Sequence, residues 1–116
     1  MIRQQAEQRG REGEARAAAW LRLKGWSILD TRVKTPVGEI DIVARRGGLI
    51  AFVEVKWRRK VADLELAIDE RRLRRVAAAA EAVAHKYATD GEDLRVDVIL
   101  LAPRAFPRHM TNVWQP

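Results

Sequence analysis

The sequence predicts an α/β protein whose elements follow in the order helix, three strands, helix, strand. Three observations carry the prediction: an amphipathic stretch opens the chain, three β-type stretches separated by turns follow it, and an alanine-rich amphipathic stretch precedes a strongly apolar one. At 116 residues the chain is long enough for one domain, residues 1–116, with a hydrophobic core of its own.

The first helix is predicted over about Gln4–Lys24. Ala17 and Leu21 recur at helical spacing within it, and Gly25 follows it in the manner of a C-cap glycine. A first strand is then expected over Trp26–Val33.

The motifs GEIDIVA and FVEVK predict two strands, Glu39–Arg45 and Leu49–Trp57, joined by a hairpin. If the turn is centred on Gly47-Gly48, Arg46 lies opposite Leu49. The turn therefore sets the register of the whole pair.

This register places Asp41 opposite Glu54 and Glu39 opposite Lys56. Two carboxylates that face each other across an antiparallel pair repel, and a cation between them would relieve the repulsion. Mg²⁺ (or Mn²⁺) takes such oxygen ligands, and Lys56 shares the face of Glu54 and could reach the same site. A structural network of ion pairs, Glu39–Lys56 and Glu54–Lys56, explains the pattern equally well.

Side-chain alternation divides the hairpin into a core face and a second face that is apolar with charges set into it. On the second face, Val43 and Phe52 lie beside the two carboxylates. The residues expected on the core face are Ile40, Ile42, Val53 and Val55.

A long helix is predicted to start at about Leu66 or Asp69 and to end at Tyr87, with an apolar stripe at i, i+3, i+4 and i+7 spacing. An apolar strand, Leu94–Leu101, follows it, and a short final strand is expected over His109–Trp114.

Two carboxylates outside the hairpin need partners. Asp97 lies in the apolar strand RVDVILL, where a buried carboxylate must be paired, and Arg95 lies on the same face of that strand. Glu14 borders the buried side of the first helix and could reach into a site on the sheet. Alternatively, Glu14 pairs with Arg11 or Arg16 on the surface of its own helix.

The charge of the chain favours a polyanionic partner such as nucleic acid: 22 Lys and Arg residues against 16 Asp and Glu residues give a net charge of +6. A basic cluster lies at the start of the second helix, where the helix dipole also favours anions. It is a candidate phosphate-binding patch or, equally, a solvated surface paired with nearby carboxylates. The residues predicted to bind nucleic acid are Arg58, Arg71, Arg72, Arg74 and Arg75.

The sequence has no cysteine, which excludes disulfides, thiolate zinc sites and thiol catalysis. The polar N-terminal stretch lacks the apolar segment of a signal peptide, and no apolar run approaches the length of a membrane span. A cytoplasmic protein without membrane association is therefore expected.

With these motifs the chain resembles the YraN-like family of uncharacterised bacterial proteins over about residues 10–114. The resemblance is carried by Gly13-Glu14, Gly38-Glu39-Ile40-Asp41, Phe52-Val53-Glu54-Val55-Lys56, Arg58 and Arg95-Val96-Asp97-Val98.

That family is similar to the PD-(D/E)XK nuclease superfamily, close to archaeal Holliday-junction resolvases. The resemblance implies a restriction-endonuclease-like αβββαβ core, with a central mixed β-sheet flanked by helices. It also implies catalytic roles: Asp41 and Glu54 as metal carboxylates, Lys56 as the catalytic lysine and Glu14 as an acidic residue from the first helix.

The leading hypothesis is a Mg²⁺-dependent (or Mn²⁺-dependent) DNA endonuclease that acts on branched or otherwise structured duplexes. The resolvase-like resemblance implies a homodimer, because symmetric cutting of two strands needs two sites. The rival hypothesis is a non-catalytic nucleic-acid-binding or adaptor protein that keeps the nuclease fold. A protein-interaction module is the third hypothesis.

Overall fold

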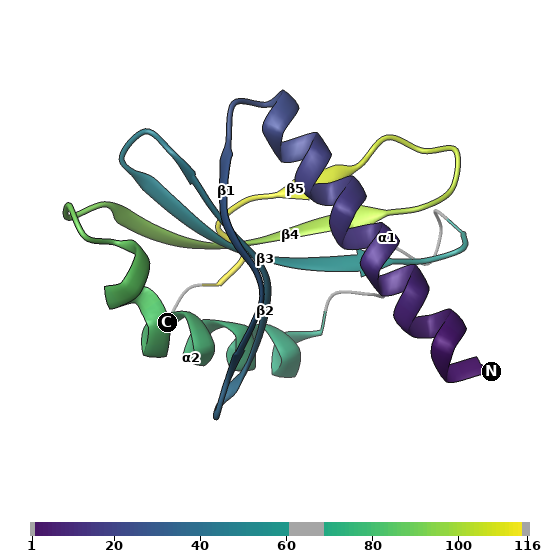
Figure 1. Cartoon of the computed structure of the whole chain (residues 1–116), viewed down its shortest axis with the longest axis horizontal. Coiled ribbons are helices and arrows are strands. Elements are labelled where there is room, and N and C mark those ends of the chain that lie inside the picture. Colours follow the sequence, from purple (N-terminus) through teal and green to yellow (C-terminus); the bar gives the residue numbers. More distant parts are fainter. Residues whose placement is uncertain (1, 61–68, 115–116) are drawn as a thin grey trace.

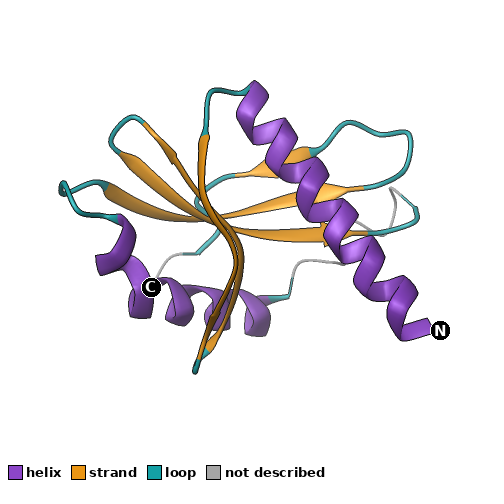
Figure 2. Ribbon diagram, in the orientation of Figure 1, coloured by secondary structure: helices purple, strands orange, loops and turns teal. Residues whose placement is uncertain are grey.

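The computed structural model describes residues 2–60 and 69–114, with the backbone alone described for residues 2–9. One helix lies on each side of a central sheet (Figure 1, Figure 2). The alternative helix start at Leu66 lies outside the described residues. The elements are α1 (Ile2–Leu23), β1 (Ser27–Thr35), β2 (Gly38–Arg46), β3 (Leu49–Trp57), α2 (Glu70–Tyr87), β4 (Asp93–Leu101) and β5 (Arg108–Met110).

The sheet has the strand order β1-β2-β3-β4-β5 and is mixed. β3 and β4 run parallel because α2 carries the chain back across the sheet between them, whereas the other neighbours are antiparallel. The predicted element order and the mixed sheet between helices are confirmed. Among the described residues, no helix is long and apolar enough to cross a membrane.

α1 covers one face of the sheet with its apolar side. Ala17 and Leu21 are fully buried there and pack against Ile42, Val53 and other side chains of that face. Ala17 and Leu21, which the sequence predicts on one side of the helix, therefore form part of the contact between α1 and the core.

α2 covers the opposite face and begins as predicted, because the Asp69 side chain accepts a hydrogen bond from the N–H of Arg71 (2.9 Å) and caps the helix. Its buried stripe includes Leu73 and Val76. The tip of the β1–β2 hairpin approaches α2 so closely that a Cβ on Gly38 would lie 2.8 Å from the carbonyl oxygen of Arg75. Glycine is required at this contact.

The prediction that Ile40 and Ile42 share a face is wrong. Ile42 belongs to the core under α1, whereas Ile40 is buried with Val43 in the core under α2. β1 and β2 curl away from the rest of the sheet as a two-stranded ribbon (Figure 1), and such ribbons twist more strongly than wide sheets. The twist turns Ile40 toward α2.

The final strand is shorter than predicted. It covers three residues, Arg108–Met110, instead of His109–Trp114. The chain leaves the sheet edge through a left-handed residue, Asn112 (φ 53°), whose N–H donates to Asp97. Trp114 then packs against the core under α2.

Candidate active site

The predicted register of the β2–β3 hairpin is confirmed from Arg46 opposite Leu49 to Ile42 opposite Val53. The ladder ends there, because β2 twists away together with β1. Asp41 is therefore not paired with Glu54 in the ladder. Its side chain makes a hydrogen bond to β3 instead: Oδ2 of Asp41 accepts from the N–H of Val55 at 2.7 Å.

Glu54 is buried, with 1% of the residue exposed, and is held by two cations. The Nζ of Lys56 lies 3.1 Å from Oε1 of Glu54, and the Nε of Arg72 donates to the same oxygen at 2.6 Å. Burial disfavours the charged guanidinium of Arg72, but the charge and hydrogen bond of Glu54 outweigh burial and raise the pKa of Arg72.

The ionised form of Asp41 is disfavoured in this site. Burial is the main cause that raises the pKa of Asp41, the charge of Glu54 adds to it, and together they bring this pKa to about 7 against the opposing Val55 N–H. The two carboxylates thus influence each other as the sequence predicts, although the ladder does not pair them.

Glu14 reaches the site side of α1, and its partner is neither Arg11 nor Arg16. The Nε of Arg32 in β1 donates to Oε2 of Glu14 at 2.6 Å. Arg32 has a left-handed backbone (φ 53°), which is costly for a residue with a side chain and is often found at functional sites. Arg32 was not predicted from the sequence, because its contact with Glu14 joins a strand to a helix and no local sequence pattern indicates such a contact.

A groove of about 470 Å³ brings Glu14 and Asp41 together on the α1 side of the β1–β2 ribbon. Basic side chains line the same groove, so an anionic ligand could enter it although two carboxylates are present. The residues that line it are Gly10, Arg11, Glu14, Arg32, Lys34, Glu39, Ile40 and Asp41.

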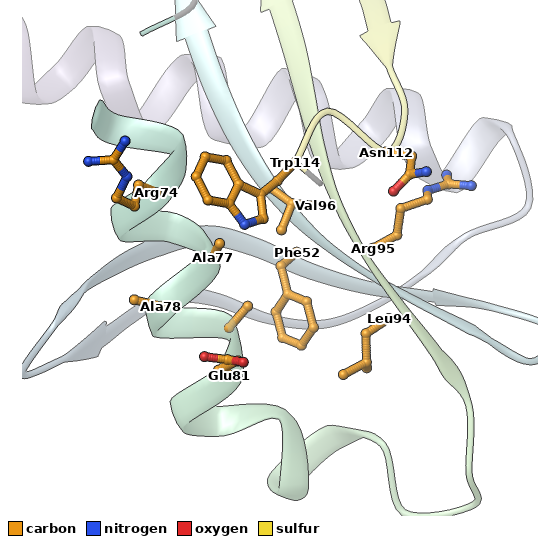
Figure 3. A pocket seen from close by; sticks show the side chains of 11 residues that line it. Phe52, Arg74, Ala77, Ala78, Glu81, Leu94, Arg95, Val96, Asn112 and Trp114 are labelled. Atoms are coloured by element: carbon orange, nitrogen blue, oxygen red, sulfur yellow. The ribbon is translucent and has the colours of Figure 1, made fainter. Parts of the chain in front are cut away.

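The four arginines of α2 do not form one patch. Arg71, Arg72 and Arg75 line a polar pocket of about 240 Å³ beside Glu39 and the helix cap. Arg74 lies elsewhere, at a pocket of about 350 Å³ that α2 forms with β4 and the C-terminal segment (Figure 3). The nucleic-acid-binding prediction for this cluster therefore concerns two different sides of the helix.

The pocket of Figure 3 is mostly apolar. Phe52, Val96 and Trp114 point into it, and Glu81 lies along the same side of α2 as Arg74. Of the described residues that line it, none is a predicted catalytic residue. Arg58, the remaining predicted nucleic-acid contact, donates to the carbonyl oxygen of Trp57 at 2.7 Å, at the end of β3.

Asp41 and Glu54 fit a hard divalent cation by the chemistry of their donor set. Both are carboxylates. Burial first and then the charge of Glu54 raise the pKa of Asp41, and a cation between the two carboxylates would relieve their repulsion. Among the described residues, no group of three or more His, Cys, Asp or Glu side chains could hold a metal ion. Water or substrate oxygens would have to complete the coordination sphere.

A model of the uncharacterised protein family UPF0102 matches residues 13–101. A UPF0102 protein of Erythrobacter litoralis is 72% identical over 116 residues, which are 100% of both chains. A UPF0102 protein of Sphingopyxis alaskensis is 61% identical, also over 100% of both chains.

The Holliday junction resolvase Hjc of Archaeoglobus fulgidus is among the solved structures that share the fold. It superposes with a TM-score of 0.59 and 20% identity over 84% of this chain and 72% of that one. At this identity the likeness concerns the fold, and it confirms the restriction-endonuclease-like αβββαβ core.

Proposed function

This chain belongs to the uncharacterised protein family UPF0102, and we propose that it is a divalent-metal-dependent DNA endonuclease acting on branched or structured duplexes. The observation that carries the proposal is the pair Asp41 and Glu54, in which burial and a like charge raise the pKa of Asp41 to about 7. Perturbed pairs of this kind concentrate at functional sites.

In this proposal Asp41 and Glu54 hold Mg²⁺ or Mn²⁺. When bound, the cation would supply charge stabilisation at a scissile phosphate and a lowered pKa for the attacking water. The Val55 N–H donates to the Asp41 carboxylate at 2.7 Å and fixes its orientation. The carboxylate therefore does not have to be ordered when the metal binds.

Lys56 and Arg72 supply positive charge beside the same carboxylate. The Lys56 side chain is 14% exposed and lies 3.1 Å from Glu54, so its ammonium would stabilise the charge of a phosphate bound at this carboxylate. Glu14 approaches from α1, where its carboxylate accepts from Arg32, and in this proposal it would help to orient a water.

Cleavage of labelled DNA tests the proposal. A four-way junction, a flap and a linear duplex are incubated with Mg²⁺ and with wild type, Asp41→Asn, Glu54→Gln or Lys56→Ala. Each variant should lose at least about 100-fold in rate, because each removes a group that stabilises the transition-state charge. Glu81→Gln on α2 is the matched control and should cut like wild type. If wild type cuts none of the substrates, or if the variants cut equally well, the catalytic assignment is wrong.

A non-catalytic nucleic-acid-binding or adaptor protein is the second candidate function. It is favoured by the two cations that already contact Oε1 of Glu54, since they make the charge network partly self-sufficient. Under this candidate, DNA binds with strong salt dependence, no strand is cut, and Glu54→Gln lowers stability without a loss of affinity.

A homodimer and a cytoplasmic location stay predictions. Two copies of the site would be needed for symmetric cutting of two strands. Sedimentation equilibrium with and without a four-way junction measures the first, and a monomer on the junction would contradict it.

A further inference from the structure

The loop between β4 and β5 carries an exposed aromatic ring. Phe106 is 85% exposed, more than any other large hydrophobic residue in the described part of the chain. Trp57, the other aromatic residue near this end of the sheet, packs against the core under α1. Phe106 is therefore the aromatic side chain that this edge presents to a partner.

Two hydrogen bonds from α1 hold the backbone of the loop. Arg16 of α1 donates from Nη1 to the carbonyl oxygen of Ala102 (3.2 Å) and from Nη2 to that of Ala105 (2.7 Å). Pro103 and Pro107 restrict the backbone on each side of the tip. A ring on such a loop loses little conformational freedom on binding, which is the property of a preorganised contact.

The surroundings of Phe106 are cationic. Arg104, with a left-handed backbone (φ 60°), precedes the ring by two residues and Arg108 follows it by two, and both are exposed. A protein partner would favour an apolar patch around an exposed phenylalanine. One ring between guanidinium groups instead matches a nucleic acid, with a base on the ring and phosphates on the arginines.

The loop lies at the same end of the sheet as the candidate active site. Lys56 is opposite Leu100 in the parallel β3–β4 pair, and the N–H of Arg58 donates to the carbonyl oxygen of Leu101 (2.9 Å). The β4–β5 loop and the end of β3 lie on the same side of the molecule (Figure 1). Arg16 under the loop is two residues from Glu14, so the loop and the groove of Asp41 flank the same turn of α1.

From these observations we propose that Phe106 stacks on an unpaired or unstacked base of the nucleic acid while Arg104 and Arg108 hold the neighbouring phosphates. The loop would then distinguish branched or frayed DNA from a continuous duplex, because a base stacked within a continuous duplex has no free face for the ring. This inference rests on the proposed function and names the structural feature of the substrate that the site would select.

Binding in EDTA tests the inference without cleavage. The probes are a fork, made of a duplex with unpaired nucleotides and 2-aminopurine at the junction, and a fully paired duplex of equal length. Phe106→Ala should lose about tenfold in affinity for the fork and less than twofold for the duplex. Phe106→Trp should keep the preference, and the change in 2-aminopurine fluorescence on binding should disappear in Phe106→Ala alone.

Two controls separate stacking from other effects. Leu23→Ala removes an equally exposed side chain (81% exposed) from the end of α1 and should bind both probes like wild type. Arg16→Ala keeps the ring but frees the loop, and should lose part of the fork preference. Equal binding of the fork by wild type and Phe106→Ala would overturn this inference alone. If wild type binds neither probe, both the inference and the proposed function are overturned.

Discussion

The sheet contains two carboxylates, Asp97 and Asp41, whose pKa values are shifted in opposite directions. Asp97 in β4 is fully buried, and it is surrounded by donors: Arg95 at 2.8 and 2.9 Å, His109 Nε2 at 2.8 Å and the N–H of Asn112 at 2.9 Å. Burial alone would raise the pKa of Asp97, but these three partners outweigh it and lower this pKa. Asp41 has its pKa raised to about 7.

The difference separates a structural carboxylate from a candidate functional one. The partners of Asp97 come from β4, β5 and the segment after it, so the ionised group ties the C-terminal segment to the sheet. The charge of Asp41 is disfavoured by burial and by Glu54, and the fold gains nothing from that repulsion. A site whose charges are unfavourable for folding is where a ligand of opposite charge is expected.

The largest effect is expected from Asp97→Ala. It leaves the Arg95 guanidinium and His109 without their buried partner, which typically costs about 3–5 kcal/mol of unfolding free energy. Urea unfolding followed by circular dichroism measures the loss. Thr111→Ala, directly after β5, is an exposed control. A loss below about 1 kcal/mol would show that Asp97 is no structural centre, and the comparison would fail.

Asp97 should also contribute to the loss of unfolding free energy at acidic pH. Its pKa is lowered in the folded protein, so its contribution is present above the unfolded value of 3.8 and is lost as the pH falls through the folded value.

The opposite sign is expected at Asp41. Because its folded pKa, about 7, lies above the unfolded value of 3.8, the ionised carboxylate destabilises the metal-free protein, and the loss grows as the pH rises toward 7. Asp41→Asn keeps an acceptor for the Val55 N–H and removes the charge. It should raise the unfolding free energy by up to about 4 kcal/mol at pH 8 and by little near pH 4. A destabilised Asp41→Asn protein at pH 8 in EDTA would contradict the assignment.

The parts of both centres that depend on local geometry could be predicted from the sequence. The Gly47-Gly48 turn and strand alternation set the β2–β3 register, and the structure confirms it from Arg46 to Ile42. Arg95 and Asp97 share a face of one strand because they are two residues apart, and their predicted ion pair is confirmed at 2.8 Å.

The parts that depend on how distant elements meet could not be predicted. The twist of the β1–β2 ribbon turned Ile40 to the other core, and the left-handed backbone of Arg32 brought it to Glu14. His109 joins Asp97 across twelve residues, and no spacing in the sequence pairs the two. No periodicity in one sequence specifies such tertiary pairs, because each is set by the packing of whole elements.

Mg²⁺ should distinguish the two centres. With a Kd of about 1 mM, 10 mM Mg²⁺ stabilises the folded protein by about 1.4 kcal/mol, which corresponds to a rise of roughly 5–8 °C in melting temperature. The rise should shrink below pH 7, because the cation then competes with the proton on Asp41. Differential scanning fluorimetry at pH 8 and pH 6 measures it. Asp41→Asn should lose the rise and Glu92→Gln should keep it; a rise of equal size in both variants would place the metal elsewhere.

The smallest expected effect concerns two arginines on α2. Arg72 is half exposed and donates to the buried Glu54 at 2.6 Å, whereas Arg74 lies 3.8 Å from the exposed Glu70. Solvent screening limits the first ion pair, so Arg72→Met should cost about 0.5–1 kcal/mol, and Arg74→Met should cost nothing measurable. Urea unfolding at 50 mM and 500 mM salt measures both, and the loss in Arg72→Met should persist at high salt because its partner carboxylate is buried. If the two variants are equally stable, Glu54 does not depend on Arg72, and the guanidinium is available to a phosphate without any loss to the fold.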